Sequence, residues 1–229
     1  MSIPISQVIK TFQGEGSCIG QPCILLRTYK CNLACTFCDS KYTWNDSDPT
    51  FILSDSNYNE FIDIIKQYNA RNLLLTGGEP SIYFDNTLYN QMIVDLLPKF
   101  KTIEIETNGS FAPFSTLKLS NFQKIKFNVS PKKVNDIVLD NIKWLKNNNI
   151  NHNIKIIHIS DKYVLEMIDN LHISIDDDNL YILPFTNTNN YETDYIRTAK
   201  FCIDNNLNIS PRFHMDVFNT AKNEYERII

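Results

Sequence analysis

The sequence lacks the features that mark membrane, secreted and nucleic-acid-binding proteins. No uninterrupted apolar run approaches the roughly 20 residues that cross a bilayer, and the first residues do not form the basic segment followed by an apolar one that a signal peptide has. We therefore expect a cytoplasmic location. The chain has 22 Lys and Arg against 26 Asp and Glu, a formal charge of -4, so it lacks the positive excess that binds nucleic acid or anionic membranes. A small-molecule ligand is expected instead.

The sequence also contains no low-complexity block, linker or solenoid repeat. Its 229 residues are 43% hydrophobic and 21% charged, close to the average for globular proteins. This composition argues against intrinsic disorder, and the length suits one domain with a sizeable core. We expect that domain to span residues 1–229.

Six cysteines are present, and three of them fall within eight residues. Cys31, Cys35 and Cys38 have the spacing Cys-x3-Cys-x2-Cys, so one short loop could direct three thiols at one centre. In a reducing compartment, clustered cysteines indicate metal ligands or catalytic thiols rather than disulfides. A structural zinc site is disfavoured because the closest His in sequence is His152, and the fourth cysteine of a bacterial ferredoxin run is missing as well. Small buried hydrophobic side chains are predicted for Cys18, Cys23 and Cys202.

Three thiolates on an iron–sulfur cluster would leave one iron open to a small chelating molecule. The amino and carboxylate groups of S-adenosylmethionine suit that position. The cysteine spacing, with the aromatic Phe37 before the third cysteine, resembles the signature of the radical S-adenosylmethionine superfamily. The resemblance implies a 4Fe-4S cluster on Cys31, Cys35 and Cys38, with Phe37 and Asp39 beside bound S-adenosylmethionine.

Short apolar runs alternate with helical patterns along the chain. Strands are predicted at residues 22–28, 72–76, 102–107, 125–129, 154–157 and 180–183, and amphipathic helices at 58–68, 88–97, 138–145 and 191–203. A short tail is expected from Asn208 onward. This α/β alternation predicts a parallel sheet with right-handed crossovers. Ligands of such sheets bind beyond the carboxyl ends of the strands, where Cys31, Gly77, Asn108 and Ser130 stand.

The strand pattern does not separate an open sheet from a closed barrel. The superfamily resemblance implies an incomplete (partial) β/α barrel with parallel strands, open at the side.

Two segments at strand ends fit cofactor binding. In Thr76-Gly77-Gly78-Glu79-Pro80 the glycines allow backbone to approach a ligand, and Glu79 can accept from an ammonium group. Taken alone, this segment is also compatible with a plain turn. The resemblance implies that Gly78 and Glu79 hold the methionyl amine of the cofactor. Ser130-Pro131-Lys132, which alone is only a turn, likewise resembles a cofactor-contacting segment.

Further motifs narrow the resemblance to the 7-carboxy-7-deazaguanine synthase family. They are Thr11-Phe12-Gln13-Gly14-Glu15-Gly16, Arg27, Cys38-Asp39-Ser40, Glu106-Thr107-Asn108-Gly109 and Ser210-Pro211-Arg212-Phe213-His214. That family contracts the ring of 6-carboxy-5,6,7,8-tetrahydropterin with loss of ammonia. The resemblance implies this substrate, Mg2+ as a further cofactor, an electron donor such as flavodoxin and a homodimer.

The same resemblance assigns site residues. It places at the substrate Phe12, Gln13, Gly14, Glu15, Arg27, Thr76 and His214. Arg27 would grip the substrate carboxylate, and Ser40 stands where the family usually has a magnesium-binding Thr. Other interpretations stay open: Arg27 as an ordinary ion-pair residue, Glu15 as a brace for its turn, and His214 as a structural donor.

Two departures from the family pattern are visible. Lys30 stands where the family usually has Gly, which predicts a different turn before the cysteines. Residues 215–220 lack the glycines expected near the C-terminus, which places substrate contacts from that end in doubt. Two other functions also stay open: a different small radical enzyme, such as one that installs a glycyl radical on a partner protein, and a non-catalytic zinc-binding module.

Overall fold

The computed structural model describes residues 2–45, 48–119, 122–185, 191–218 and 226–228. One curved sheet has the strand order β10-β1-β2-β4-β5-β6-β7-β8-β9, with β3 paired to β1. Its parallel strands are β2 (Pro22–Thr28), β4 (Asn72–Gly77), β5 (Thr102–Thr107), β6 (Ile125–Val129), β7 (Asn151–His158), β8 (Leu180–Pro184) and β9 (Asn208–Ile209). In the described part of the chain the edge strands β9 and β10 do not pair with each other, so the predicted incomplete barrel is confirmed.

One edge of the sheet is antiparallel, which the sequence pattern did not predict. Its strands are β1 (Ser2–Phe12), β3 (Phe51–Ser54) and β10 (Glu226–Arg227). The register of β1 against β2 shifts between Ile5 and Gln7, and this irregularity interrupts the alternation of buried and exposed residues. Pro4, which pairs with Ile52 of β3, adds a second irregularity because it has no backbone N–H to donate.

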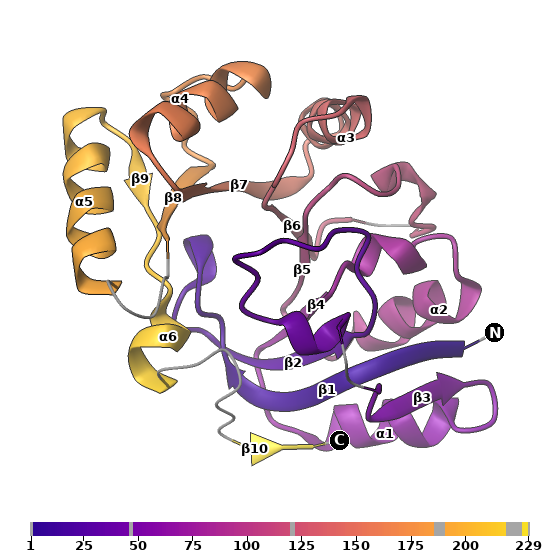
Figure 1. The fold of residues 1–229 in the computed structure, drawn as a ribbon. Helices are drawn as coiled ribbons and strands as arrows, with labels where there is room; N and C mark the ends of the chain where they lie inside the picture. The colour runs from indigo at the N-terminus through magenta and orange to yellow at the C-terminus, as the bar shows by residue number, and fades with distance from the viewer. Residues whose placement is uncertain (1, 46–47, 120–121, 186–190, 219–225, 229) are drawn as a thin grey trace.

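Five helices lie around the outside of the curved sheet (Figure 1). They are α1 (Tyr58–Gln67), α2 (Thr87–Leu96), α3 (Asp136–Asn147), α4 (Asp161–Asn170) and α5 (Tyr191–Asp204). Four of them match predicted helices, whereas α4 is a correction to the predicted order. Ser160 caps α4, and Val164, Met167, Ile168 and Leu171 bury a stripe with helical spacing. No helix in the described ranges is long and apolar enough to cross a membrane.

The two faces of the sheet differ in chemistry because successive side chains of a strand point to opposite sides. Outward-facing side chains such as Leu73, Ile105 and Phe127 pack with the helices in the main apolar cluster. The intervening positions mix apolar side chains such as Leu25 and Leu74 with polar ones, including Glu106 on β5 and Lys155 on β7, and these line a cavity on the inner face. Hydrophobic burial therefore stabilises the outer shell, whereas the inner face also carries buried polar and charged groups.

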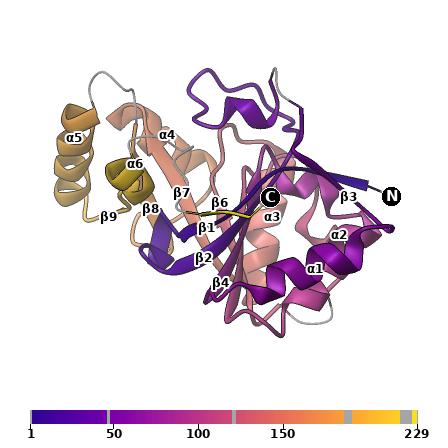
Figure 2. The ribbon, with the colours of Figure 1, turned by 90° about the horizontal axis from the view of Figure 1, so that it is seen from below.

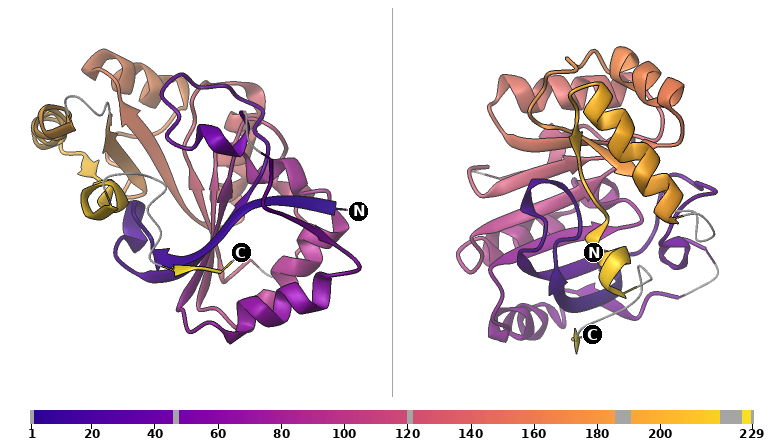
Figure 3. Two further views of the ribbon diagram at one scale, coloured as in Figure 1. Left: turned by 60° about the horizontal axis from the view of Figure 1, so that its bottom comes forward. Right: turned by 90° about the vertical axis from the view of Figure 1, so that its left-hand side faces the viewer.

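The C-terminal segment is not a tail. It forms β9 and α6 (Phe213–Phe218), and Figure 3 shows both beside the loop that follows β1. Gly16 N donates to Ser210 Oγ over 2.7 Å, and Phe213 N donates to Gly14 O over 2.9 Å. Segments almost 200 residues apart thus meet at the open side of the sheet. Of the residues in which glycines were expected, 219 and 220 lie outside the described ranges.

Lys30 adopts a backbone conformation that favours glycine. Its φ is 81°, in the left-handed region, so the turn keeps the geometry that a Gly would have and the expectation of a different turn is wrong. We expect Lys30→Gly to raise the free energy of unfolding by about 0.5–1 kcal/mol, because relief of strain outweighs the added freedom of the unfolded chain. Urea unfolding would measure this gain. Lys30→Ala, the control, keeps the strain and should give no gain; an equal gain from alanine would contradict the explanation.

Candidate functional site

The carboxyl ends of the parallel strands surround a cavity of about 250 Å³. Residues 30–43, the cysteine loop, stand beyond this end of the strands in Figure 2. The cavity is lined by all but one of the residues predicted for the site, namely Phe12, Gln13, Gly14, Glu15, Arg27, Cys31, Cys35, Phe37, Cys38, Asp39, Ser40, Thr76, Gly78, Glu79, Ser130, Lys132 and His214. Pro131 is buried and does not line it. One cavity therefore brings together positions spread from β1 to α6.

The cysteine loop is closed at its base by Lys30 N, which donates to Thr43 O over 2.8 Å. Its three cysteines, Cys31, Cys35 and Cys38, are partly buried free thiols. Burial raises the pKa of Cys31 to about 11, and the neighbouring Cys38 and Cys35 add to the increase. Three thiols thus share one wall of the cavity. Of the other cysteines, Cys23 and Cys202 are buried as predicted, whereas Cys18 is only half-buried, which corrects that prediction.

These thiols fit an iron–sulfur cluster better than a single ion. Among the described residues, no three His, Cys, Asp or Glu side chains are grouped closely enough to hold one metal ion. Zinc would need such a group around one point, whereas each thiolate of a cluster binds a different iron. The three thiols open on the same cavity, and none is consumed in a disulfide. They would hold a cluster through three of its irons.

Gly78 and Glu79 follow β4 directly beneath the cysteine loop. A Cβ on Gly78 would lie 2.0 Å from Lys30 O, so only glycine allows this approach. The Glu79 carboxylate accepts from Ser81 N at 3.0 Å, Thr107 Oγ1 at 2.5 Å and Asn108 N at 2.7 Å. Burial raises the pKa of Glu79, and these hydrogen bonds oppose the increase. The site thereby holds a fixed acceptor at the end of two strands.

Arg27 is a buried cation on β2, with 8% of its surface exposed. Its Nε donates to Gln7 Oε1 and its Nη1 to Ser40 Oγ, both over 3.3 Å, and the guanidinium lies 5.8 Å from the centre of the Tyr42 ring. It forms no ion pair within the described ranges, so the ion-pair interpretation is wrong. Burying a guanidinium without an acidic partner costs free energy unless a bound anion pairs with it. The cavity therefore has a place for a carboxylate.

A charged network crosses the inner face from Asp39 to Glu106. Lys155 Nζ lies 2.7 Å from Glu15 Oε2 and 2.5 Å from Glu106 Oε2, and Arg212 Nε lies 3.0 Å from Glu15 Oε1. Arg212 also pairs with Asp39. Although burial opposes it, Lys155 and Arg212 lower the pKa of Glu15, while burial raises that of Glu106. Glu15 thus braces the loop after β1, as one interpretation held.

Lys155, Glu106 and Arg212 were not assigned roles from the sequence. Lys155 and Glu106 each stand at an alternating polar position within an otherwise apolar strand, which is the signal that points to the inner face. Arg212 had no such signal.

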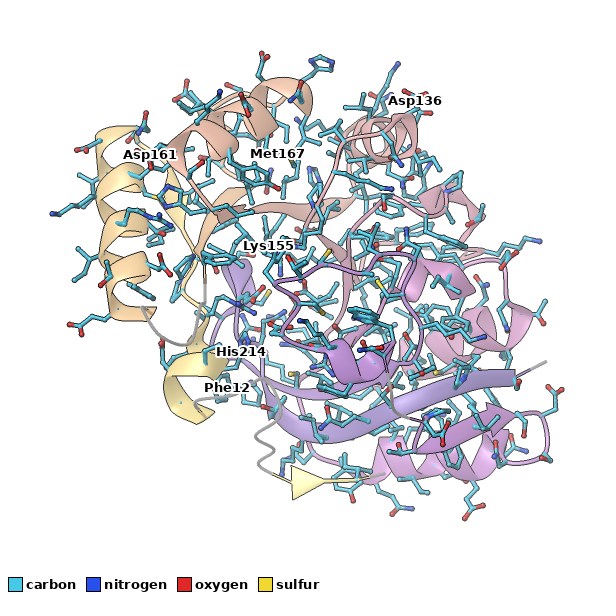
Figure 4. All side chains as sticks on the ribbon, viewed as in Figure 1. Phe12, Asp136, Lys155, Asp161, Met167 and His214 are labelled. Carbon is cyan, nitrogen blue, oxygen red and sulfur yellow. The ribbon has the colours of Figure 1, made fainter. Side chains whose placement is uncertain are left out.

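His214 packs against the backbone of the N-terminal loop. A Cβ on Gly14 would lie 2.0 Å from His214 Nδ1, and the rings of Phe12 and Phe213 have centroids 4.9 Å apart. Figure 4 shows Phe12 and His214 together beside α6, with Lys155 of β7 above them in this view. Burial lowers the pKa of His214, so the neutral ring is favoured. The C-terminal segment therefore does reach the cavity.

Gln13 lines the cavity and is hydrogen-bonded into a second polar layer. Its Nε2 donates to Glu104 Oε2 over 3.1 Å and to Glu106 Oε1 over 3.2 Å. Asn128 Nδ2 donates to the same two carboxylates over 2.9 and 3.0 Å, and Asn128 Oδ1 accepts from Asn153 Nδ2 over 2.8 Å. The Gln13 side chain is thus held by the protein.

Ser40 does not form a prepared magnesium site. Its Oγ donates to Asp39 Oδ1 over 2.7 Å and accepts from Arg27 Nη1 over 3.3 Å, so a cation there would lie beside a guanidinium. Asp39, the nearest carboxylate, is already paired with Arg212. These groups as placed do not fit Mg2+, which prefers several hard oxygen ligands without a competing positive charge.

The network predicts a loss of stability in acid. The pKa values of Glu15 and Asp39 lie below their ordinary values of 4.5 and 3.8, so their contribution is present above those values and is lost as pH falls through the folded-state pKa values. We expect the free energy of unfolding to fall below about pH 4.5, and Glu15→Gln to make that fall shallower. Urea unfolding between pH 7 and pH 3 measures the slope. The exposed Glu60→Gln is the control; equal slopes for both variants would contradict the assignment.

Known proteins resemble the chain in sequence and in fold. The model of the Radical SAM superfamily matches residues 25–171. A 7-carboxy-7-deazaguanine synthase of Clostridium acetobutylicum is 28% identical over 97% of this chain and 99% of its own length, and one of Thermoplasma acidophilum is 28% identical over 62% and 65%. Alignments to the first curated relatives span 65%, 56% and 52% of those proteins.

Two solved structures share the fold. QueE from Escherichia coli has a TM-score of 0.67 at 23% identity and covers 93% of this chain and 95% of its own. Streptococcus suis SuiB bound to S-adenosylmethionine has a TM-score of 0.55 at 17% identity, over 80% of this chain and 48% of its own. At these identities the likeness concerns the fold alone.

Proposed function

The chain belongs to the radical S-adenosylmethionine superfamily, and from that premise we propose that it is a 7-carboxy-7-deazaguanine synthase. Its substrate would be 6-carboxy-5,6,7,8-tetrahydropterin, whose ring is contracted with loss of ammonia. The observation that carries this proposal is Arg27, a buried guanidinium without an acid partner among the described residues, in the same cavity as three free thiols. The Clostridium acetobutylicum relative, aligned over nearly the whole chain, supports the choice.

The side chains that line the cavity indicate which of them would bind the cluster and the cofactor. Cys31, Cys35 and Cys38 would hold the cluster, which together with S-adenosylmethionine supplies the radical chemistry that removes a hydrogen atom from the substrate. Glu79, fixed by three hydrogen bonds, would accept from the cofactor amine, close to the backbone of Gly78. This side of the cavity thus serves the cofactor.

Substrate binding would use other residues of the same cavity. Arg27 would hold the substrate carboxylate through its planar fork of donors. Glu106 lines the same cavity, where Lys155 Nζ lies 2.5 Å from its Oε2. The contacts of Gly14 with His214 close the side of the cavity, which would exclude water from the reacting atoms.

Turnover of the pterin tests this function directly. Reconstituted protein, incubated without oxygen with a reductant, S-adenosylmethionine and the carboxylated tetrahydropterin, should yield 7-carboxy-7-deazaguanine by mass spectrometry. Its absence from protein with an intact cluster would overturn the substrate assignment. A glycyl-radical activating role gains no support from the cavity, because a protein substrate does not require the buried Arg27. Colourless protein with stoichiometric zinc would instead support the zinc-binding module.

Three further parts of the proposal rest on the resemblance to the family. Magnesium would need Ser40 to exchange its bond with Arg27 for one with the ion, and turnover in the presence of a chelator with and without added Mg2+ tests this. A homodimer would show in sedimentation at micromolar concentration. An electron donor such as flavodoxin would be recognised by its ability to support turnover in place of a chemical reductant.

A further inference from the structure

An indole N–H is directed at one of the three cysteine sulfurs. Trp44 Nε1 donates to Cys38 Sγ over 3.4 Å, and the backbone Leu33 N donates to Cys31 Sγ over the same distance. The first of these donors belongs to a side chain, so it can be removed by substitution. The indole nitrogen is a donor only, so its contact with sulfur has one possible sense.

Hydrogen bonds hold the backbone of the segment that carries this indole. Thr43 is fully buried, its N and Oγ1 both donate to Ser40 O over 2.9 and 2.8 Å, and Lys30 N donates to Thr43 O. Trp44 N then donates to Lys41 O over 3.1 Å. The backbone of Trp44, which follows the base of the cysteine loop, is therefore held by hydrogen bonds. Its indole ring lies toward Cys38.

We propose that Trp44 is a positioning residue that raises the reduction potential of the cluster by donating a hydrogen bond to Cys38 Sγ. Sulfur gains electron density when the cluster accepts one electron, so a donor to that sulfur stabilises the reduced form more than the oxidised form. The inference rests on the proposed function only in requiring that the three cysteines hold a 4Fe-4S cluster.

A redox titration tests the role of the N–H. Reconstituted wild type, Trp44→Phe and a variant with benzothienylalanine at position 44, which keeps the bicyclic shape and lacks the N–H, would be titrated with dithionite and mediators while the reduced cluster is followed by electron paramagnetic resonance. At a fixed potential both variants should show about a tenfold lower ratio of reduced to oxidised cluster, which is a shift of roughly 59 mV to more negative potential. Trp144→Phe, which changes the other tryptophan of the chain, a partly buried side chain packed against the apolar core, is the matched control and should not shift.

The outcomes separate this inference from the proposed function. Wild type that binds no cluster would contradict the proposed function. A cluster with wild-type potential in the benzothienylalanine variant would overturn the role of Trp44, and this holds even where Trp44→Phe loses iron for reasons of packing. A shift in that variant with unchanged iron content supports it.

Discussion

Arg27→Ala should lower pterin turnover by about 10²–10³-fold, because a buried charge-assisted contact of this kind is worth about 3–4 kcal/mol when one partner is removed. The guanidinium is 8% exposed, lies against Ser40 and Tyr42, and meets no acid in the described ranges, so the substrate carboxylate would be its counter-ion. Turnover of the pterin under anaerobic conditions, with iron content measured on the same sample, gives the effect.

Two controls make the Arg27 result specific. Arg27→Lys keeps the positive charge but loses the planar pair of guanidinium N–H donors, so it should retain part of the pterin turnover. Cleavage of S-adenosylmethionine in the absence of pterin should be unchanged in both variants, since Arg27 is assigned to the substrate. Pterin turnover at the wild-type rate in Arg27→Ala would contradict the substrate carboxylate as its partner and reopen the glycyl-radical alternative.

Lys155→Met should lower the free energy of unfolding by about 3–5 kcal/mol, since it removes the shared partner of two carboxylates in a buried network. The Lys155 side chain is 1% exposed, and its ammonium lies within 2.7 Å of Glu15 and 2.5 Å of Glu106. Arg212 still neutralises Glu15 after the change, so Glu106 is the carboxylate left without a cation. Urea unfolding at pH 7 measures the loss.

A second substitution tests the cause of that loss. Lys155→Met combined with Glu106→Gln removes the isolated charge as well, and we expect it to regain part of the lost stability. A double variant that is less stable than Lys155→Met would show that the network does not act through the Glu106 charge.

The sequence predicts the parts of the molecule in which local pattern and structure coincide. The runs that form β4, β5 and β6 are short, apolar and bounded by turns, so their positions were predicted almost to the residue. β1 was not predicted because a register shift and Pro4 interrupt the alternation of buried and exposed residues along it. The stripe of α4 was present in the sequence but was not assigned to a helix.

Some residues of the candidate site could likewise be predicted from the sequence, and others could not. Cys31, Cys35 and Cys38 lie on one loop, so spacing alone identifies them. Glu15 and Arg212 meet across 197 positions, and Glu15 and Lys155 across 140, so only the folded chain shows that they form one network. Resemblance to a family marked Glu15, but its two ion pairs follow from the way β7 and the C-terminal segment return to the N-terminal loop.

The most direct test of the three-cysteine cluster with one open iron is an electron paramagnetic resonance spectrum of the reduced protein, recorded with and without S-adenosylmethionine. Binding at an iron without a protein thiolate should change the spectrum on addition of the cofactor, in protein with about four irons per chain. A spectrum that stays the same at saturating S-adenosylmethionine, or a preparation that binds zinc in place of iron, would contradict the cluster site and the function proposed from it.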